Sequence, residues 1–178
     1  MADRRAFFLL AITGACSLLA NDNVAWGPAN NNLCIGLRLE KTLANGAVLI
    51  YVQNTGRAPR DLYINDGPVQ RWLFTAIAPN GKRIKIQDRL FYLSCGLCAR
   101  QPLTERLAPG ATRKWTYAFD RQFYIPPSGP TTTLGKLSEQ DYALQVSLEV
   151  TADQLKTSHL SPGSPWLGHV DSPAVAIR

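Results

Sequence analysis

Apolar and polar residues alternate with a period of two along much of the chain. The pattern is clearest over residues 33–40, 112–119 and 142–150. Successive side chains of a strand point to opposite faces, so each run predicts a β-strand with one buried face. A nearly continuous apolar run at 47–53 predicts a central strand. Nothing in the chain predicts a helix longer than the single turn expected at 151–157.

Turn residues separate these runs. A Pro-Asn-Gly sequence at 79–81 lies between two β-rich runs, 71–78 and 82–87, and its Asn-Gly pair favours the positive φ angles of a tight hairpin turn. Prolines and glycine interrupt residues 120–135, which we expect to form a loop. Shorter apolar runs predict minor strands at 61–64 and 173–177.

These features predict an all-β protein. Short strands with turn signals about every ten residues are typical of an antiparallel β-sandwich, and we expect about seven to nine strands with little helix. Strand content alone does not separate such a sandwich from a closed barrel. Residues 26–178 have the length of a single domain.

Residues 1–20 have the features of an export signal peptide. Arg4 and Arg5 precede the uncharged run 6–15, which is shorter than the about 20 apolar residues that cross a bilayer as a helix. An uncleaved N-terminal anchor is therefore the weaker alternative. We expect an extracytoplasmic protein, in the periplasm, on the outer membrane as a lipoprotein, or secreted.

Two processing routes stay open. Cleavage after Ala20 leaves Asn21 as the new N-terminus, although Leu18 is a poor residue two places before that site. Alternatively, Ile-Thr-Gly-Ala-Cys at 12–16 resembles a bacterial lipobox, whose cleavage would make Cys16 the lipidated N-terminus. A lipid anchor at Cys16 is then the only expected contact with a membrane.

The chain has a formal net charge of +6 at pH 7, but its basic residues are scattered. Lys82, Arg83 and Lys85 form the densest cluster, in which an apolar residue alternates with basic ones as on a strand with one solvated face. A solvated face is the first interpretation of this cluster. The second is a ligand face for an anionic envelope polymer. No nucleic-acid partner is expected.

The four cysteines bear on redox state and on partners. Either processing route leaves Cys34, Cys95 and Cys98 in the folded domain, and an odd number in an exported protein leaves one thiol free or intermolecular. Cys95 and Cys98 can pair with each other, or Cys34 can pair with either. A structural disulfide is favoured over redox or metal chemistry, because redox thiols need a helix after the C-x-x-C motif and residues 99–102 make a poor one.

Four short motifs resemble those of bacterial extracytoplasmic immunoglobulin-like sandwich domains. They are Trp26-Gly27 followed by Leu-Cys-Ile-Gly-Leu at 33–37, the strand 48–54 followed by Gly56, the Leu-Ala-Pro-Gly turn at 107–110, and a closing segment at 166–175 with Trp, Gly, Val and Ser. The resemblance implies an immunoglobulin-like fold, in a family of stand-alone exported proteins and ectodomains. The Cys–Trp–Cys spacing of antibody domains is absent, and such a fold does not by itself assign an activity.

The sequence motifs of common enzymes are missing. The chain contains no G-x-S-x-G, S-x-x-K or H-E-x-x-H pattern, and its two histidines are too few for a zinc or copper site of the usual kinds. Asp61, Asn65 and Asp66 are better explained by an Asx turn than by calcium binding. We therefore expect neither an enzyme nor a bound cofactor or metal.

The leading hypothesis is a non-enzymatic envelope or secreted β-sandwich that binds a protein partner or itself. An exposed edge strand can accept a strand from a neighbour, and Cys34 is the candidate to lock such a contact. One alternative is a module for envelope polysaccharide or lipid, which would use the basic cluster and exposed tryptophans beside Tyr92 or Tyr124. The other is a thiol redox protein that uses Cys95 and Cys98.

Overall fold

The computed structural model describes residues 23–41, 46–63, 71–88, 104–120, 122–125, 129–153 and 165–177. The expected export signal at 1–20 lies outside these residues, as do Cys16, Cys95 and Cys98. Within the described ranges, no helix is both long enough and apolar enough to cross a membrane.

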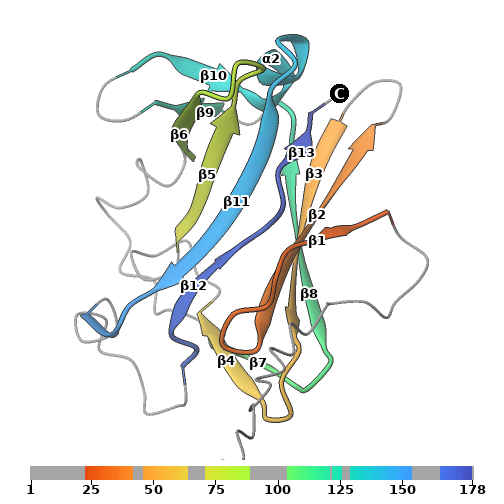
Figure 1. Ribbon diagram of the computed structural model, residues 1–178, viewed down its shortest axis with the longest axis vertical. Helices are drawn as coiled ribbons and strands as arrows, with labels where there is room; N and C mark the ends of the chain where they lie inside the picture. The colour runs from red at the N-terminus through yellow and green to blue at the C-terminus, as the bar shows by residue number, and fades with distance from the viewer. Residues whose placement is uncertain are drawn as a thin grey trace, which may run out of the picture.

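The described part of the chain consists of antiparallel strands and one short helix, α2 (Leu134–Glu139). The strands are β1 (Ala25–Trp26), β2 (Leu33–Lys41), β3 (Gly46–Asn54), β4 (Arg60–Tyr63), β5 (Arg71–Ile77), β6 (Arg83–Asp88), β7 (Thr104–Leu107), β8 (Thr112–Ala118), β9 (Gln122–Tyr124), β10 (Thr131–Thr133), β11 (Ala143–Val150), β12 (Gly168–Asp171) and β13 (Val175–Ala176). One sheet has the order β1-β2-β3-β8, and a larger one has the order β10-β9-β6-β5-β11-β12 with β13 beside β11 (Figure 1). β4 and β7 form a separate pair. The prediction of an all-β protein with antiparallel strands is confirmed, and both large sheets are open rather than closed on themselves.

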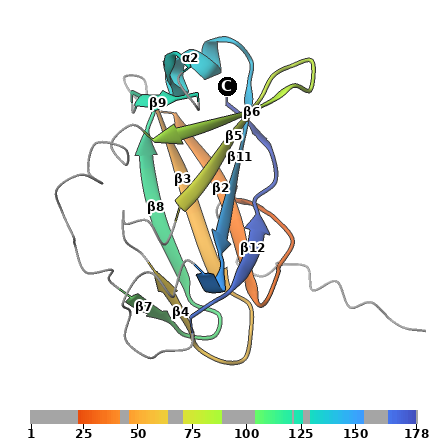
Figure 2. The same cartoon turned by 90° about the vertical axis from the view of Figure 1, so that its left-hand side faces the viewer.

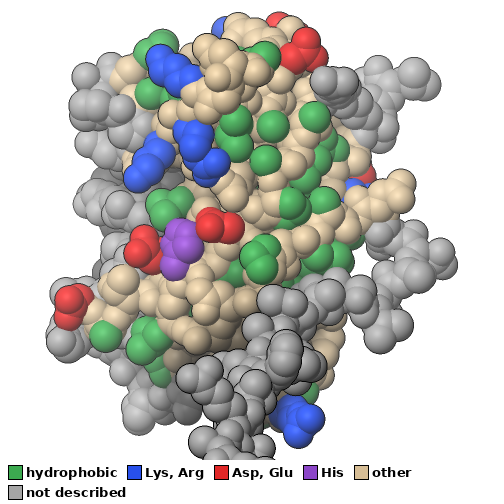
Figure 3. All heavy atoms as spheres, in the orientation of Figure 1, with side chains coloured by type: hydrophobic (Ala, Val, Ile, Leu, Met, Phe, Trp, Pro, Cys, Tyr) green, Lys and Arg blue, Asp and Glu red, His purple; other side chains and the backbone are tan. Residues whose placement is uncertain are grey.

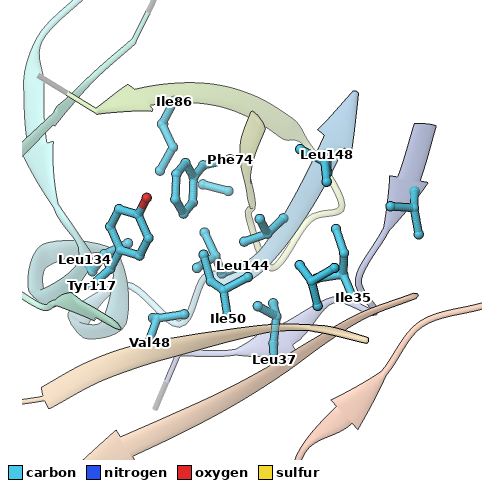
Figure 4. Close-up of a cluster of buried hydrophobic side chains, with 14 of the residues drawn as sticks. Ile35, Leu37, Val48, Ile50, Phe74, Ile86, Tyr117, Leu134, Leu144 and Leu148 are labelled. Carbon is cyan, nitrogen blue, oxygen red and sulfur yellow. The ribbon is translucent and has the colours of Figure 1, made fainter. Parts of the chain in front are cut away.

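The two large sheets face each other across one hydrophobic core (Figure 4). Phe74 of β5 lies edge-to-face against two rings, with centroid distances of 5.2 Å to Tyr117 of β8 and 5.1 Å to Phe123 of β9. Trp72 and Trp115 make a second edge-to-face contact between β5 and β8, at 5.1 Å. Aromatic pairs prefer this arrangement because the positive ring edge meets the negative ring face. The side chains of β5 and β8 therefore hold the two sheets together on this side of the core.

The hairpin predicted over 71–87 is confirmed, with a longer turn than expected. β5 and β6 pair antiparallel, and Ala78 N donates to Lys82 O at 2.9 Å. Within the turn only Gly81 has a positive φ, of 82°, and its N donates to Ala78 O at 2.8 Å. The connection is thus a turn followed by a left-handed glycine, which makes a three-residue hairpin loop in place of a two-residue one.

The segment 120–135, which was expected to be a loop, contains regular structure. β9 and β10 pair antiparallel, and α2 begins directly after β10. The Thr133 side chain caps α2 by accepting a hydrogen bond from Lys136 N at 3.2 Å. Leu134 and Leu137 of α2 are buried. Burial of these leucines in the core stabilises a helix that is too short to form on its own.

A tight turn that the sequence pattern did not predict joins β1 to β2. Asn31 and Asn32 both have positive φ angles, of 47° and 67°. Asn30 and Leu33 exchange two backbone hydrogen bonds, with N···O distances of 2.8 and 3.0 Å. These are the features of a type I′ hairpin turn, and asparagine is among the few residues that adopt the left-handed conformation at low cost.

The side chain of Asn54, at the end of β3, is completely buried and makes three hydrogen bonds. Its Nδ2 donates to Ala58 O and Leu107 O, both at 2.9 Å, and its Oδ1 accepts from Gly56 N at 3.0 Å. Its backbone oxygen also accepts from Gly110 N at 2.8 Å. One residue therefore joins the end of β3 to the loop that follows it, to the end of β7 and to the turn that precedes β8.

We expect Asn54→Ala to lower the free energy of unfolding by about 2–4 kcal/mol, because it leaves several buried backbone groups without a partner. Urea unfolding measures the change, which should appear as a lower midpoint at an unchanged m value. Gln53→Ala, on the same strand but half-buried, is the control and should cost less than about 1 kcal/mol. Equal losses in the two variants would contradict the role of Asn54.

Candidate functional site

The basic residues predicted to form a ligand face lie in the turn before β6 and in the first half of that strand. Arg83 and Lys85 are exposed and alternate with core residues such as Ile86, so both lie on the outer face of the larger sheet. Lys82 belongs to the preceding turn, where its backbone N donates to Asn80 Oδ1 at 3.0 Å. The structure therefore brings two of the three residues to one face.

That outer face carries charges of both signs. The Arg83 guanidinium donates to the side-chain oxygen of Gln145 on β11. The Asp171 carboxylate, on β12, accepts from the Ser147 hydroxyl and lies 3.0 Å from His169 Nε2. Figure 3 shows basic, acidic and histidine side chains gathered on the side turned to the viewer. Because the carboxylates offset the cations, this face resembles a solvated sheet surface more than a patch for an anionic polymer.

Ser147, Asp171 and His169 do not have the order of a nucleophilic triad. Such a triad places the histidine between the hydroxyl and the carboxylate, so that the imidazole accepts the hydroxyl proton. Here Asp171 Oδ1 lies between the other two groups and contacts both. Ser147 is also buried, with 7% of its surface exposed. The three side chains form a polar link between β11 and β12.

Cys34 is completely buried on β2, and its Sγ lies 3.9 Å from Gln53 Oε1. The expected role of Cys34 in locking a contact between molecules needs an accessible sulfur, and this burial opposes it. Disulfides that involve Cys95 or Cys98 stay predictions, because both residues lie outside the described ones. The same holds for the redox alternative and for lipidation at Cys16.

The four tryptophans do not form an exposed aromatic face. Trp166 is buried, and Trp72 and Trp115 are half-buried against each other. Trp26 is half-buried on the opposite side of its sheet, with its ring 6.2 Å from that of Tyr51. The interpretation of the tryptophans as packing residues is therefore favoured over a carbohydrate-binding face.

The edge of the larger sheet at β12 is covered by side chains of the β1–β2 turn. Asn30 Nδ2 donates to His169 O at 2.7 Å, and Asn31 Nδ2 donates to Leu167 O at 2.9 Å. These amides occupy backbone oxygens that an added strand would need. Natural sheets often cover their edges in this way, which prevents unwanted pairing with other chains.

The edge of the four-stranded sheet at β8 is organised differently. β8 has seven residues and pairs with β3 alone among the described strands. Phe119 N donates to Gly46 O at 2.8 Å and Asn54 N donates to Ala111 O at 3.1 Å. These two bonds, at the two ends of the pair, show which alternate residues of β8 form hydrogen bonds with β3. The alternation of an antiparallel pair then directs the backbone groups of residues 113, 115 and 117 to β3.

The other residues of β8 turn their N–H and C=O groups away from β3. They are Thr112, Lys114, Thr116 and Ala118, and all four are exposed. Within the described ranges no hydrogen bond engages these outward groups. Figure 2 shows β8 at the side of its sheet, next to β3. A row of unpaired backbone groups of this kind is what a strand needs in order to accept another.

Sequence reasoning predicted a strand at 112–119 but did not identify it as the open edge. One signal for an edge was present: Arg113 and Lys114 are adjacent cations, so that both faces of the strand carry a charge. Lysine and arginine are common on edge strands, where they oppose pairing with unrelated chains.

A comparison with protein-family models and with curated proteins finds no match for this chain. Among the described residues there is no group of three or more histidine, cysteine, aspartate or glutamate side chains that could hold a metal ion. Asn65 and Asp66, weighed above as calcium ligands, lie outside those residues. The open edge of β8 is therefore the candidate functional site.

We expect the amides of β8 to exchange with solvent in an alternating pattern. The four outward residues should exchange rapidly and the three between them slowly, because only the second set donates to β3. Hydrogen–deuterium exchange followed by NMR on the monomeric protein measures this pattern. The central strand β3, which is paired on both sides, gives the protected reference. Uniform protection along β8 would mean that its edge is covered.

Proposed function

We propose that this protein is an exported immunoglobulin-like β-sandwich that serves as a protein-interaction or self-assembly module of the cell envelope, with β8 as its docking strand. The open edge of β8 carries the proposal, because it presents four exposed residues with outward backbone groups. A strand that adds to this edge gains main-chain hydrogen bonds along its length, and its side chains provide specificity.

The immunoglobulin-like part of the proposal is supported by contacts between the motifs that carry the resemblance. The Asn-x-Gly motif at 54–56 meets the Leu-Ala-Pro-Gly turn through the Asn54 side chain, which donates to Leu107 O. Trp166 of the closing segment donates from Nε1 to Asn31 O at 3.1 Å, close to the first motif. Motifs that are far apart in sequence thus take part in one packing arrangement, as expected for the signature of a single fold.

Photo-crosslinking in the native host tests the docking strand. A photoreactive residue in place of Thr112, which is exposed on β8, should form a covalent adduct with a protein, because the added strand lies beside it. The same residue in place of Lys85, which is exposed on β6, is the matched control and should form none. An adduct of twice the chain mass identifies self-assembly, and any other protein adduct identifies a partner. Absence of an adduct at position 112, or equal adducts at both positions, contradicts the proposal.

Thr116→Pro should abolish that adduct. Proline at this outward position removes one edge N–H and breaks no hydrogen bond to β3, so the fold should persist. Thr116→Ala keeps the N–H and should retain the adduct. Circular dichroism and thermal unfolding of both variants confirm that they are folded. An adduct that survives in Thr116→Pro would exclude strand addition at β8.

The export part of the proposal predicts the mass of the mature chain. Intact-mass measurement on the native membrane and soluble fractions should give either an acylated chain that begins at Cys16 or an unmodified chain that begins at Asn21. The first result would establish a tethered lipoprotein and the second a soluble secreted protein. A chain that begins at Met1 as the sole form would overturn export.

A further inference from the structure

We infer that the strand which pairs with β8 is acidic and amphipathic, with a carboxylate opposite Lys114 and an apolar side chain opposite Trp115. The inference rests on the proposed function, since it names the chemistry of the partner at that docking strand. Two separate observations carry it: the charge on the outer face of β8, and the half-buried ring on its inner face.

The outer face of β8 offers one cation, Lys114, that has no counter-charge beside it among the described residues. Lys114 is exposed between Thr112 and Thr116, and its register partner on β3 is Tyr51. Neither β3 nor β8 contains a carboxylate. Among the described residues no ion pair involves Lys114. Directly opposed side chains of opposite charge stabilise a strand pair, whereas like charges destabilise it.

A second copy of β8 does not supply the missing carboxylate. Its sequence, Thr-Arg-Lys-Trp-Thr-Tyr-Ala, contains two cations and no anion. The whole chain has a formal net charge of +6, which adds a general repulsion between copies. These charges therefore favour a different, acidic chain over self-pairing at this edge.

The inner face of β8 requires an apolar neighbour. Trp115 is half-buried and makes its edge-to-face contact with Trp72, which is also half-buried. Trp72 is paired with Leu148 of β11, whereas β6 pairs with β5 only from Phe74 onward, so Trp72 lies before the part of β5 that is paired with β6. The residue of an added strand that lies opposite Trp115 would form a non-hydrogen-bonded pair with it, in which the side chains approach most closely. An apolar side chain there would remove more of the Trp115 ring from water.

Two nine-residue peptides test this inference. Both have valine at every second position and threonine between the valines, and they differ only in a central glutamate or lysine. Fluorescence anisotropy of the labelled peptides measures Kd for the purified protein. The glutamate peptide should bind about fivefold more tightly than the lysine peptide, and 0.5 M salt should reduce the difference. Tryptophan emission should shift to the blue as the glutamate peptide saturates the protein.

A charge reversal on β8 isolates the contribution of Lys114. Lys114→Glu should invert the preference, so that the lysine peptide binds about fivefold more tightly than the glutamate peptide. Lys85→Glu makes the same change of net charge on the other sheet and should keep the original preference. A preference that shifts equally in both variants would show a general charge effect and would overturn the pairing of a carboxylate with Lys114.

Thr116→Pro separates this inference from the proposed function. Equal affinities of the two peptides, both lost in Thr116→Pro, would leave β8 as the docking strand and overturn the acidic partner. Binding that Thr116→Pro does not change would overturn both. Failure of the glutamate peptide to bind up to its solubility limit would also overturn the inference.

Discussion

The buried amide of Asn54 is the constraint on which the geometry of the β8 edge depends. A buried side-chain amide is costly unless its polar atoms find partners, so its hydrogen bonds fix the positions of the segments that supply them. Here those segments are the loop after β3 and the end of β7. The Asn54 backbone also bonds to Gly110 and Ala111, directly before β8 begins. The register of the edge strand is therefore set by the same residue that ends the central strand.

The edges of the two sheets differ in whether their outward backbone groups are covered by side chains. At β12, the side-chain amides of Asn30 and Asn31 donate to backbone oxygens and so occupy them. The absence of a side chain at Gly27 permits the backbone there to approach β12 closely, because a Cβ would lie 2.1 Å from Asp171 O. At β8 the outward backbone groups have no such cover among the described residues, and Lys114 stands in the middle of the edge. A central lysine discourages pairing with neutral or basic strands. In the proposed docking mode the lysine becomes favourable when the incoming strand is acidic, so the same residue disfavours neutral or basic strands and favours one class.

Local sequence patterns predicted the main strands, because they reflect burial. Period-two alternation located β2, β8 and β11, a nearly continuous apolar run located β3, and two β-rich runs beside the Pro-Asn-Gly turn located β5 and β6. The local pattern also marked β4 through the short apolar run at 61–64. It missed α2, whose stability comes from the burial of Leu134 and Leu137 in a core assembled from distant segments. It also missed the Asn31–Asn32 turn, which lacks the glycine that marks most turns of this type. The ligand face was predicted from Lys82, Arg83 and Lys85, of which the structure brings the last two to one face. Asp171 and His169, which lie on the same face, come from a strand far away in sequence.

The order of strands in a sheet is a property of the whole fold, so no local pattern could identify β8 as the open edge. Once that order is known, the alternation of buried and exposed residues along β8 also indicates which residues bond to β3. The residues of β8 that face the core, such as Trp115 and Tyr117, are also those whose backbone bonds to β3. The residues between them direct their side chains away from the core and their backbone groups away from β3. In the proposed docking mode, folding and recognition therefore depend on alternate residues of one strand, and substitutions at Lys114 or Thr116 would change what binds without altering the contacts that hold the two sheets together.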